Sequence, residues 1–435
     1  MSAIKKQKRA DIDKILEDNK HAPAQGSAEW LAGRKFTVGG SVMAGIIGKN
    51  VPGNKASTIR SLATQKVGLS RFPSKKQMRW GNICEPISRM YTEHVLRTKI
   101  DETGAIPGRI KHLKYSPDGL GVVSMSRMEK RLTDLYIPWK RYDGLKEYAN
   151  VLFEYKNPFS RVPKAGVIPV GYQIQMQTGM YTIENMEMGL FVDSVVRKCK
   201  LYDLNHTNTY EAAYFNDKPM LTNDPICYGF MGVCQSISDM IDEENDSEES
   251  EESEFDFEDA DFLDTLNTLD CSEPSFAPDH SHGFCEKNIL AHGDHGEYID
   301  FGNCSEHNFD VMATGVINGR FEAYYTQPRR SGPFRFYQEW NKFLEFCDAG
   351  GYQPIGLMPW KLFQLELVPL KKDPNFFKPV YQKRINKLID YVKQYHDKPT
   401  SEKAEALERF FPKYNPDVDI IDVKSYELLK AGGLV

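Results

Sequence analysis

Hydrophobic positions in the middle of the chain change their period from strand to helix and back to strand. The short apolar run at Val151–Lys156 predicts a strand, Gly171–Asn185 has helical spacing, and Glu187–Val196 predicts another strand. This order of strand, helix and strand is typical of an α/β fold.

Less regular patterns flank this unit. Helical segments are expected around Ala28–Ile47 and Met78–Arg97. Towards the other end of the chain, a strand at Trp360–Pro369 precedes the amphipathic helix Phe376–His396. The expected architecture is therefore a central mixed sheet flanked by helices, with a large insertion between its last two strands.

Changes in composition divide the chain into five segments. Residues 1–20 are expected to form a basic N-terminal tail or a solvated helix, and residues 21–216 the first part of the core. Residues 217–310 are expected to be an insertion with an acidic, disordered run at 236–270. Residues 311–400 would complete the insertion and return to the core, and residues 401–435 would form a C-terminal extension.

The net charge of −6 conceals a positive body. Fourteen of the 61 carboxylates lie between Asp242 and Asp264, a stretch without Lys or Arg. The remaining chain carries 55 basic and 47 acidic groups, a net charge of +8. This excess suits an anionic partner such as nucleic acid, although a modest positive excess is also common in proteins with other roles.

Composition also excludes several classes of protein. The longest apolar runs, such as Val42–Gly48, are far shorter than the roughly 20 residues that cross a bilayer. No apolar stretch of a secretory signal follows the basic residues Lys5 to Arg9. Eight cysteines are too dilute for a disulfide scaffold. We therefore expect an intracellular protein with mostly free thiols and no membrane contact.

The most informative side chains lie at the end of the predicted strand Val151–Lys156. Because side chains alternate along a strand, Glu154 and Lys156 share one face and Tyr155 points to the other. Alone, this would be an ordinary ion pair. Asp118, in the turn Ser116–Leu120, adds a second carboxylate, although alone it would be only a turn former.

Pro117-Asp118, a gap of 35 residues, and then Glu154-Tyr155-Lys156 form the pattern of PD-(D/E)XK nucleases. Mg²⁺ prefers oxygen ligands, which Asp118, Glu154 and the carbonyl of Tyr155 can supply. A bound metal lowers the pKa of water and neutralises charge on a phosphate. Lys156 can orient the attacking water and stabilise developing charge.

Glu85 is a further candidate ligand. It precedes Pro86, which suits the first turn of a helix, so Glu85 could be only an anion that stabilises a helix N-terminus. The alternative is that Glu85 reaches the same metal from the side.

Several short motifs follow one another along the first half of the chain. They are Gln25-Gly26-Ser27-Ala28-Glu29-Trp30, Arg34, Ser41, Trp80-Gly81 with Glu85 and Tyr91, Ser116-Pro117-Asp118-Gly119-Leu120, Glu154-Tyr155-Lys156-Asn157-Pro158-Phe159, and Tyr172 with Gln175-Met176-Gln177 and Met180. In this order they resemble the lambda exonuclease, or YqaJ-type viral recombinase, family, over roughly residues 25–196, and the resemblance is expected to resume at 357–396. Each motif alone is weak, but their common order is hard to explain by chance.

The resemblance implies a PD-(D/E)XK fold and a 5′→3′ exonuclease that digests double-stranded DNA with two Mg²⁺ or Mn²⁺ ions. By position, the metal ligands would be Glu85, Asp118, Glu154 and the Tyr155 carbonyl, and the catalytic residues Asp118, Glu154 and Lys156. It further suggests a viral or phage origin, a single-strand-annealing partner, a role in recombination or repair and, if viral, a place in the host cytoplasm or nucleus.

The same resemblance implies that Arg34, Ser41, Ser116 and Gln175 hold the 5′-terminal phosphate of the DNA. A guanidinium offers two parallel hydrogen bonds to a phosphate, and hydroxyl and amide groups supply further donors. A phosphate anchored there would place the next phosphodiester over the metals, which would make the enzyme an exonuclease. Alone, Arg34 and Gln175 would be ordinary polar helix residues.

The insertion departs from the pattern of the family. About 150 residues separate Val196 from the returning strand near Trp360, so a ring-shaped oligomer is in doubt and the oligomeric state stays open. Histidines and cysteines at 280–307 could bind zinc, although no CxxC pair is present. The acidic run could be a solvated loop, or it could mimic DNA charge and compete for a basic groove.

Two other functions remain open at this point. A structure-selective DNA endonuclease of the same fold would use the metals without the phosphate pocket. A catalytically inactive DNA-binding scaffold would not need the intact set Asp118, Glu154 and Lys156.

Overall fold

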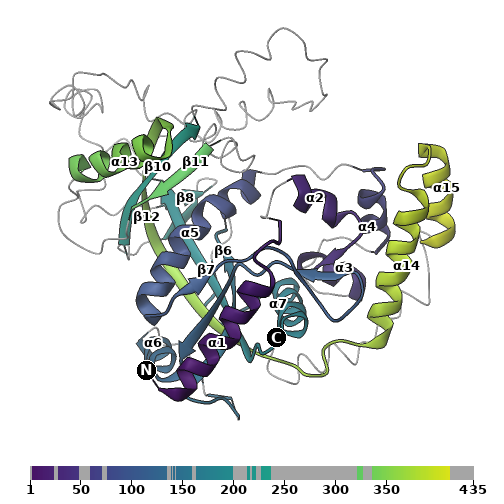
Figure 1. The fold of residues 1–435 in the computed structure, drawn as a ribbon, viewed down its shortest axis with the longest axis horizontal. Coiled ribbons are helices and arrows are strands. Elements are labelled where there is room, and N and C mark those ends of the chain that lie inside the picture. The colour runs from purple at the N-terminus through teal and green to yellow at the C-terminus, as the bar shows by residue number, and fades with distance from the viewer. Residues whose placement is uncertain are drawn as a thin grey trace, which may run out of the picture.

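The structure is a computed structural model that describes residues 2–23, 28–48, 59–70, 76–134, 139, 141–142, 144–158, 163–198, 213–215, 218–221, 227–236, 321–326 and 336–411. Within these residues the fold is the expected mixed α/β architecture, with a central sheet flanked by helices (Figure 1). The acidic stretch after Ser236 and the histidines and cysteines at 280–307 lie outside the described residues.

Seven strands form the central sheet in the order β11-β10-β12-β7-β6-β5-β2. Their bounds are β2 Ile100–Asp101, β5 Gly119–Ser124, β6 Tyr148–Lys156, β7 Met188–Lys198, β10 Cys227–Ser236, β11 Phe321–Tyr325 and β12 Tyr352–Lys371. Only β6 and β7 pair in parallel, and the other neighbours are antiparallel. The sheet is therefore mixed, as the sequence predicted.

Smaller sheets and the helices surround this sheet. One small sheet has the order β1-β4-β3, with β1 at Val38–Gly39, β3 at Ile106–Pro107 and β4 at Leu113–Tyr115, and a hairpin joins β8 (Ala213–Phe215) to β9 (Lys218–Leu221). The helices are α1 Ala3–Asp18, α2 Ala28–Arg34, α3 Met43–Ile47, α4 Ile59–Lys66, α5 Lys76–Leu96, α6 Met125–Asp134, α7 Val170–Thr182, α13 Phe336–Gly350, α14 Pro379–Tyr395 and α15 Thr400–Phe410, with a 3-10 turn η1 at Gly40–Val42.

The predicted strand–helix–strand unit is confirmed as β6, α7 and β7. Alternate residues of β6 enter different cores. Val151, Phe153 and Tyr155 pack with residues of α5 and α6, whereas Leu152 packs with residues of α7 and α1 on the opposite face. The strand is therefore buried on both faces, which explains its continuous apolar run.

Helix α5 differs from the expectation at Pro86. The helix begins at Lys76, so Pro86 lies inside it, and Glu85 is not at a helix N-terminus. Burial of Ile83, Ile87 and Tyr91 against the sheet holds the helix together across the backbone hydrogen bond that proline cannot donate. The interpretation of Glu85 as a capping anion is therefore wrong.

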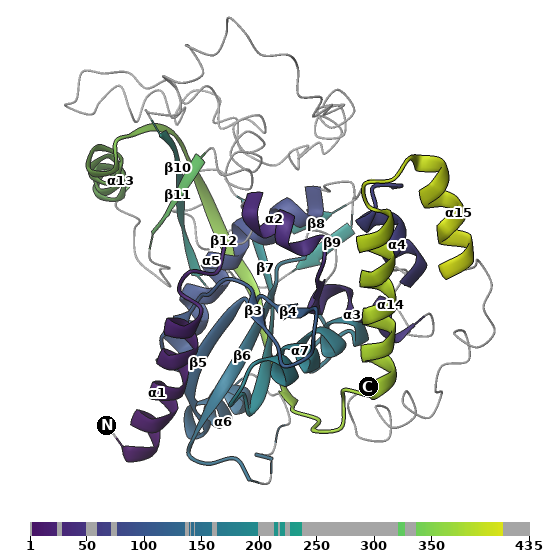
Figure 2. The ribbon, with the colours of Figure 1, turned by 45° about the vertical axis from the view of Figure 1, so that its right-hand side comes forward.

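The N-terminal segment is a packed helix and not a solvated one. Ile12 and Ile15 of α1 are buried in the same core as Leu152, and α1 lies along β5 and β6 (Figure 2). Two of its basic side chains make ion pairs with the body of the protein, Arg9 with Asp101 at 2.5 Å and Lys8 with Glu187 at 2.7 Å.

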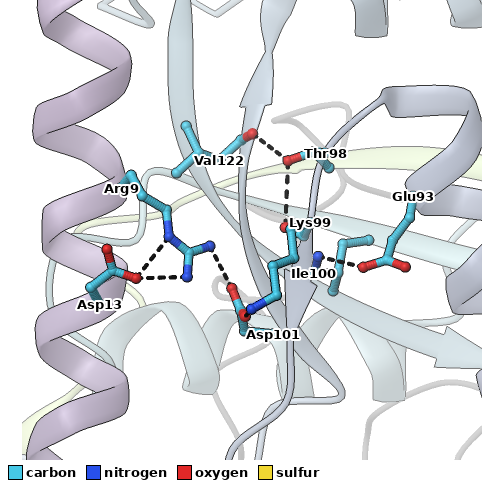
Figure 3. Close-up of polar contacts among 8 residues, drawn as sticks. All are labelled: Arg9, Asp13, Glu93, Thr98, Lys99, Ile100, Asp101 and Val122. Carbon is cyan, nitrogen blue, oxygen red and sulfur yellow. Dashed lines mark hydrogen bonds and ion pairs between the residues drawn. The ribbon is translucent and has the colours of Figure 1, made fainter. Parts of the chain in front are cut away.

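Figure 3 shows the anchor of α1 in detail. The guanidinium of Arg9 bridges Asp13 of its own helix and Asp101 of β2, and Lys99 also contacts Asp101. The buried carboxylate of Asp101 therefore has two cationic partners, which together lower its pKa against the opposing effect of burial. The sequence pattern of basic residues 5–9 gave no sign of this role, because the partner is distant in the chain.

The segment predicted as an insertion contributes to the central sheet. Strand β10 pairs with β12 on one side and with β11 on the other. Strand β12 begins at Tyr352, before the predicted start at Trp360, and its pairing with β10 shifts register at a bulge between Val233 and Cys234. Helix α14, at Pro379–Tyr395, agrees closely with the predicted Phe376–His396.

A separate group of helices lies on the other side of the molecule from α13 (Figure 1). Helices α14, α15, α3 and α4 share one apolar cluster, whose largest members come from α14. None of the described helices is long and apolar enough to cross a membrane. Four cysteines of the described residues are buried and outside any disulfide there, namely Cys84, Cys227, Cys234 and Cys347.

Replacement of Ile12 by alanine tests whether α1 is part of the core. Because Ile12 is fully buried, Ile12→Ala should lower the free energy of unfolding by about 2–5 kcal/mol, measured by denaturant titration. The matched control Ile4→Ala removes a side chain of the same helix that is 38% exposed, and it should change stability by less than about 0.5 kcal/mol. Equal stability of both variants would show that α1 is a loose tail.

Candidate active site

Asp118, Glu154 and Lys156 meet where β5 begins and β6 ends. The two strands are antiparallel, and Gly119 pairs with Phe153, so the turn that carries Asp118 lies beside the last residues of β6. Glu154 and Lys156 lie on one face of β6 while Tyr155 packs into the core on the other face, as alternation predicted. One strand pair thus brings together Asp118 and Glu154, which are far apart in the sequence.

The ammonium of Lys156 stands between the two carboxylates. Its Nζ lies 2.5 Å from Glu154 Oε1 and 3.3 Å from Asp118 Oδ2, and it donates to the Tyr155 carbonyl at 2.6 Å. Asp118 Oδ2 also accepts the backbone N–H of Tyr155 at 2.9 Å. The ammonium of Lys156 therefore contacts Asp118, Glu154 and the Tyr155 carbonyl, the oxygen groups that the sequence predicted as metal ligands here.

Glu154 is fully buried, and its two oxygens have different partners. Oε2 accepts the hydroxyl of Tyr115 at 2.9 Å, and Oε1 accepts the amide of Gln175 at 2.6 Å in addition to Lys156. Burial and then the charge of Asp118 raise the pKa of Glu154 to about 7, although Lys156 and Tyr115 act in the opposite direction.

Burial and nearby charges also shift the pKa values of Lys156 and Glu85. Burial alone would lower the pKa of Lys156, but Asp118 and Glu154 raise it overall, so the ammonium stays charged. Burial, followed by the negative charges of Asp118 and Glu154, raises the pKa of Glu85 well above its usual range, and Lys156 opposes this shift. Glu85 is therefore electrostatically part of the group, even though it comes from α5.

The donor set fits a hard divalent cation. Among the residues that the structure describes, no three His, Cys, Asp or Glu side chains form a ready metal cage. The ammonium of Lys156 instead occupies a position between the oxygens of Asp118, Glu154 and the Tyr155 carbonyl, and there it stands in for a bound cation. Two carboxylates spaced to share one cation, with Glu85 near them, are the ligand chemistry of Mg²⁺ or Mn²⁺.

The predicted phosphate-binding residues divide into two pairs. Arg34 stacks over the ring of Trp30 at 4.4 Å, and the indole N–H of Trp30 donates to Ser116 Oγ at 3.4 Å. Ser116 lies two residues before Asp118, so this chain of contacts links an exposed guanidinium to the carboxylate site.

The second pair, Ser41 and Gln175, lies on two elements that pack against each other, η1 and α7. Ser41 is exposed on η1, and η1 packs on α7, the helix that carries Gln175. The amide of Gln175 donates to Glu154, so Gln175 lies directly beside the carboxylates. A role for these four residues in phosphate binding stays a prediction.

Two neighbouring residues were missed by the sequence analysis. Lys66 Nζ donates to the carbonyls of Arg34 and Thr37 at 2.6 and 2.7 Å, and burial and then the charge of Arg34 lower the pKa of Lys66 to about 8. Tyr115 contacts Glu154 and directly precedes the Ser116-Pro117-Asp118 motif. Its position at a strand end beside that motif was the only sequence signal.

A buried polar network fixes α5 behind the site. Asn157, the residue after Lys156, accepts hydrogen bonds from Ser88 of α5 and Ser194 of β7, each at 2.6 Å. Because Ser88 lies three residues after Glu85, this network sets how α5 presents Glu85 to the other carboxylates.

Comparison with known proteins identifies this part of the chain. Residues 29–185 match the family model described as YqaJ-like viral recombinase domain. This part of the chain is similar to YqaJ-like viral recombinase domains. Every candidate site residue lies inside it, from Arg34 to Gln175, and the resemblance inferred from the motifs is confirmed.

Proteins of a virus are among the curated relatives of this chain. A protein of African swine fever virus is 28% identical over 228 residues in the strain Badajoz 1971 Vero-adapted, and its counterpart in the isolate Tick/Malawi/Lil 20-1/1983 is 28% identical over 227 residues. Each match covers 50% of this chain and 62% of the relative. The chain therefore matches less than two thirds of the length of these relatives.

Solved structures give a weaker comparison. An alkaline exonuclease from Laribacter hongkongensis is 21% identical, with a TM-score of 0.28, over 39% of this chain and 74% of that chain. A phage related exonuclease from Haemophilus somnus 129PT is 14% identical, with a TM-score of 0.26, over 42% of this chain and 76% of that chain. The assignment of the fold depends on the sheet and helices described above and not on these scores.

Divalent metal should stabilise the YqaJ-like domain. If a cation is shared by the carboxylates, Mn²⁺ at about 100 times its Kd should stabilise the folded protein by about 2.7 kcal/mol. The rise in Tm should be larger at about pH 8 than at about pH 6, because Glu154, with a pKa of about 7, must lose its proton to bind metal.

Thermal unfolding with and without Mn²⁺ measures this effect, and Asp118→Asn should remove it. The control Asp390→Asn changes an exposed carboxylate of α14, outside the site, and should keep the full response. A rise in Tm that persists in Asp118→Asn would place the metal elsewhere.

Proposed function

We propose that this protein is a metal-dependent exonuclease that digests one strand of double-stranded DNA in the 5′→3′ direction from a 5′-phosphorylated end. The observation that carries the proposal is the cation of Lys156 shared by Asp118 and Glu154 inside a YqaJ-like viral recombinase domain. The match of residues 29–185 to the viral recombinase family model supports the same class of reaction.

Each residue of the site has a chemical task in this proposal. Glu85, Asp118, Glu154 and the Tyr155 carbonyl would hold two Mg²⁺ or Mn²⁺ ions, which when bound supply an activated water and neutralise charge on the scissile phosphate. Lys156 keeps its proton, so its ammonium can orient the attacking water and stabilise negative charge on the phosphate.

The binding of metal requires the ammonium to give up part of its contact with the carboxylates. Lys156 is only partly buried by its neighbours and sits at the end of β6, so its side chain can swing towards the phosphate and leave the oxygens of Asp118 and Glu154 to the metal. The stacking of Tyr172 under the ammonium at 5.3 Å offers an aromatic face that keeps the cation near the site during this exchange.

Recognition of the DNA end is assigned to Arg34, Ser41, Ser116 and Gln175. Arg34 is exposed and stacked on Trp30, so its planar guanidinium can offer two hydrogen bonds to a terminal phosphate. The charge of Lys66 beside Arg34 adds to the attraction for an anion. A phosphate held there would set the next phosphodiester over the carboxylates.

The product of such a reaction is duplex DNA with a 3′ overhang, which suits recombination or repair by annealing. A single-strand-annealing protein is the partner that this product requires. This partner, a place inside the host cell and the oligomeric state stay predictions.

A time course on end-labelled linear duplex tests metal use, polarity and end dependence together. The wild type should release nucleotides from the 5′ end, and a chelator should stop the reaction. Glu154→Ala and Lys156→Ala should lower the rate by at least about 10³-fold, because each removes a group that acts on the reacting phosphate, while DNA binding by anisotropy stays measurable.

Other substrates distinguish the remaining functions. Nicking of a closed circle at a rate similar to that of linear DNA would favour an endonuclease. Binding without any cleavage in the presence of Mg²⁺ or Mn²⁺ would favour an inactive scaffold.

Substitution of Arg34 tests the recognition of the end. Arg34→Ala should reduce the preference for a 5′-phosphate over a 5′-hydroxyl by about 10- to 100-fold, because it removes a charge-assisted contact worth about 1.5–3 kcal/mol. The control Arg109→Ala removes an exposed guanidinium that is paired with Glu184, and it should keep the preference. An unchanged preference in Arg34→Ala would exclude Arg34 from the end-binding site.

A further inference from the structure

Tyr115 places a buried hydroxyl on the central carboxylate of the site. Tyr115 ends β4, is 1% exposed, and donates its phenolic hydrogen to Glu154 Oε2 at 2.9 Å. Lys156 contacts the other oxygen, Oε1. The hydrogen bond from Tyr115 therefore restrains the Glu154 oxygen that Lys156 does not contact.

The ring of Tyr115 is held between two glycines. A Cβ added to Gly40 of η1 would lie 2.3 Å from Tyr115 Cε2, and one added to Gly179 of α7 would lie 2.5 Å from Tyr115 Cζ. Both distances are far too short for real contacts, so the ring fits only because these positions lack a side chain. The hydroxyl is thus fixed in space by packing from two different elements.

The donors on Glu154 together define the plane of its carboxylate. The last torsion of a glutamate is broad and nearly free, so a buried carboxylate without directional partners can rotate. Tyr115 holds Oε2, whereas Gln175 and Lys156 hold Oε1. Because the donors hold different oxygens, rotation would break at least one of these bonds, and Oε1 stays directed towards the cation shared with Asp118.

We propose that Tyr115 is a positioning residue for metal binding, which acts by fixing the carboxylate of Glu154. The inference deepens the proposed function and depends on it, since it concerns the same ions. Hydrogen-bond partners behind a metal ligand set its orientation, and their loss typically weakens metal affinity or activity by about 10- to 100-fold. Tyr115 itself does not touch the substrate or the reacting atoms in this proposal.

The test uses the full chain without DNA. Free Mn²⁺ is measured by its electron paramagnetic resonance signal during titration of the wild type, Tyr115→Phe and Tyr391→Phe. Tyr391 is a matched control, because it is also fully buried and its hydroxyl donates to the Lys403 carbonyl at 2.9 Å, within the α14–α15 helices. Tyr115→Phe should bind Mn²⁺ about 10- to 100-fold more weakly, and Tyr391→Phe should bind it within about 2-fold of the wild type.

Kinetics separate positioning from a general loss of structure. For Tyr115→Phe the Mn²⁺ concentration at half-maximal digestion should rise by about the same factor, while KM for DNA stays unchanged and saturating Mn²⁺ restores most of the rate. A variant that was merely less well folded would lose rate at every Mn²⁺ concentration. Unchanged Mn²⁺ affinity in Tyr115→Phe would overturn the proposal.

A second variant keeps the hydroxyl but moves it. In Gly40→Ala the new methyl group must displace the ring of Tyr115, so this variant should also bind Mn²⁺ more weakly than the wild type. Gly40→Ala provides the test if Tyr115→Phe does not fold. Failure of the proposed function looks different. If the proposed function is wrong, the wild type and Asp118→Asn should bind Mn²⁺ equally. If only the Tyr115 proposal is wrong, the wild type should bind Mn²⁺ more tightly than Asp118→Asn does, and Tyr115→Phe should bind it as tightly as the wild type.

Discussion

The compensation of buried negative charge is the constraint on which the site depends. Glu154 is fully buried and lies close to Asp118 and Glu85, and an arrangement of like charges in a low-dielectric environment is costly unless a cation is shared. The ammonium of Lys156 supplies that charge within the folded chain. The same unfavourable grouping would favour the binding of a divalent ion, because a metal there would relieve the repulsion between the carboxylates.

The scaffold keeps these groups together. The parallel pair β6 and β7, joined by α7, is the rigid centre, and the antiparallel strand β5 brings Asp118 to the end of β6. The network of Ser88, Asn157 and Ser194 then ties α5 to both strands. Several elements are thus locked around one carboxylate, so small shifts in packing would change the site more than most surface substitutions would.

The described structure extends well beyond the matched residues 29–185. Strands β10, β11 and β12 widen the central sheet on the side of β7, and α13 packs on them (Figure 1). On another side α14 and α15 cover α3 and α4, next to the turn η1 that carries Ser41. Helices α14 and α15 lie outside the matched residues 29–185, whereas α3, α4 and η1, against which this side of the molecule packs, lie inside them.

The sequence by itself determined the local features of this protein. Alternation along β6 places Glu154 and Lys156 on one face, the order of motifs identifies the family, and periodicity predicts α7, β7 and α14, because each depends on neighbours in the chain. Only the tertiary structure decided the partners of Glu154, the packing of α1 and the place of β10 in the sheet. Tyr115 and Gln175 reach Glu154 from 39 and 21 residues away, and Arg9 reaches Asp101 from 92. Contacts over such separations are set by how whole elements pack, which no local pattern encodes.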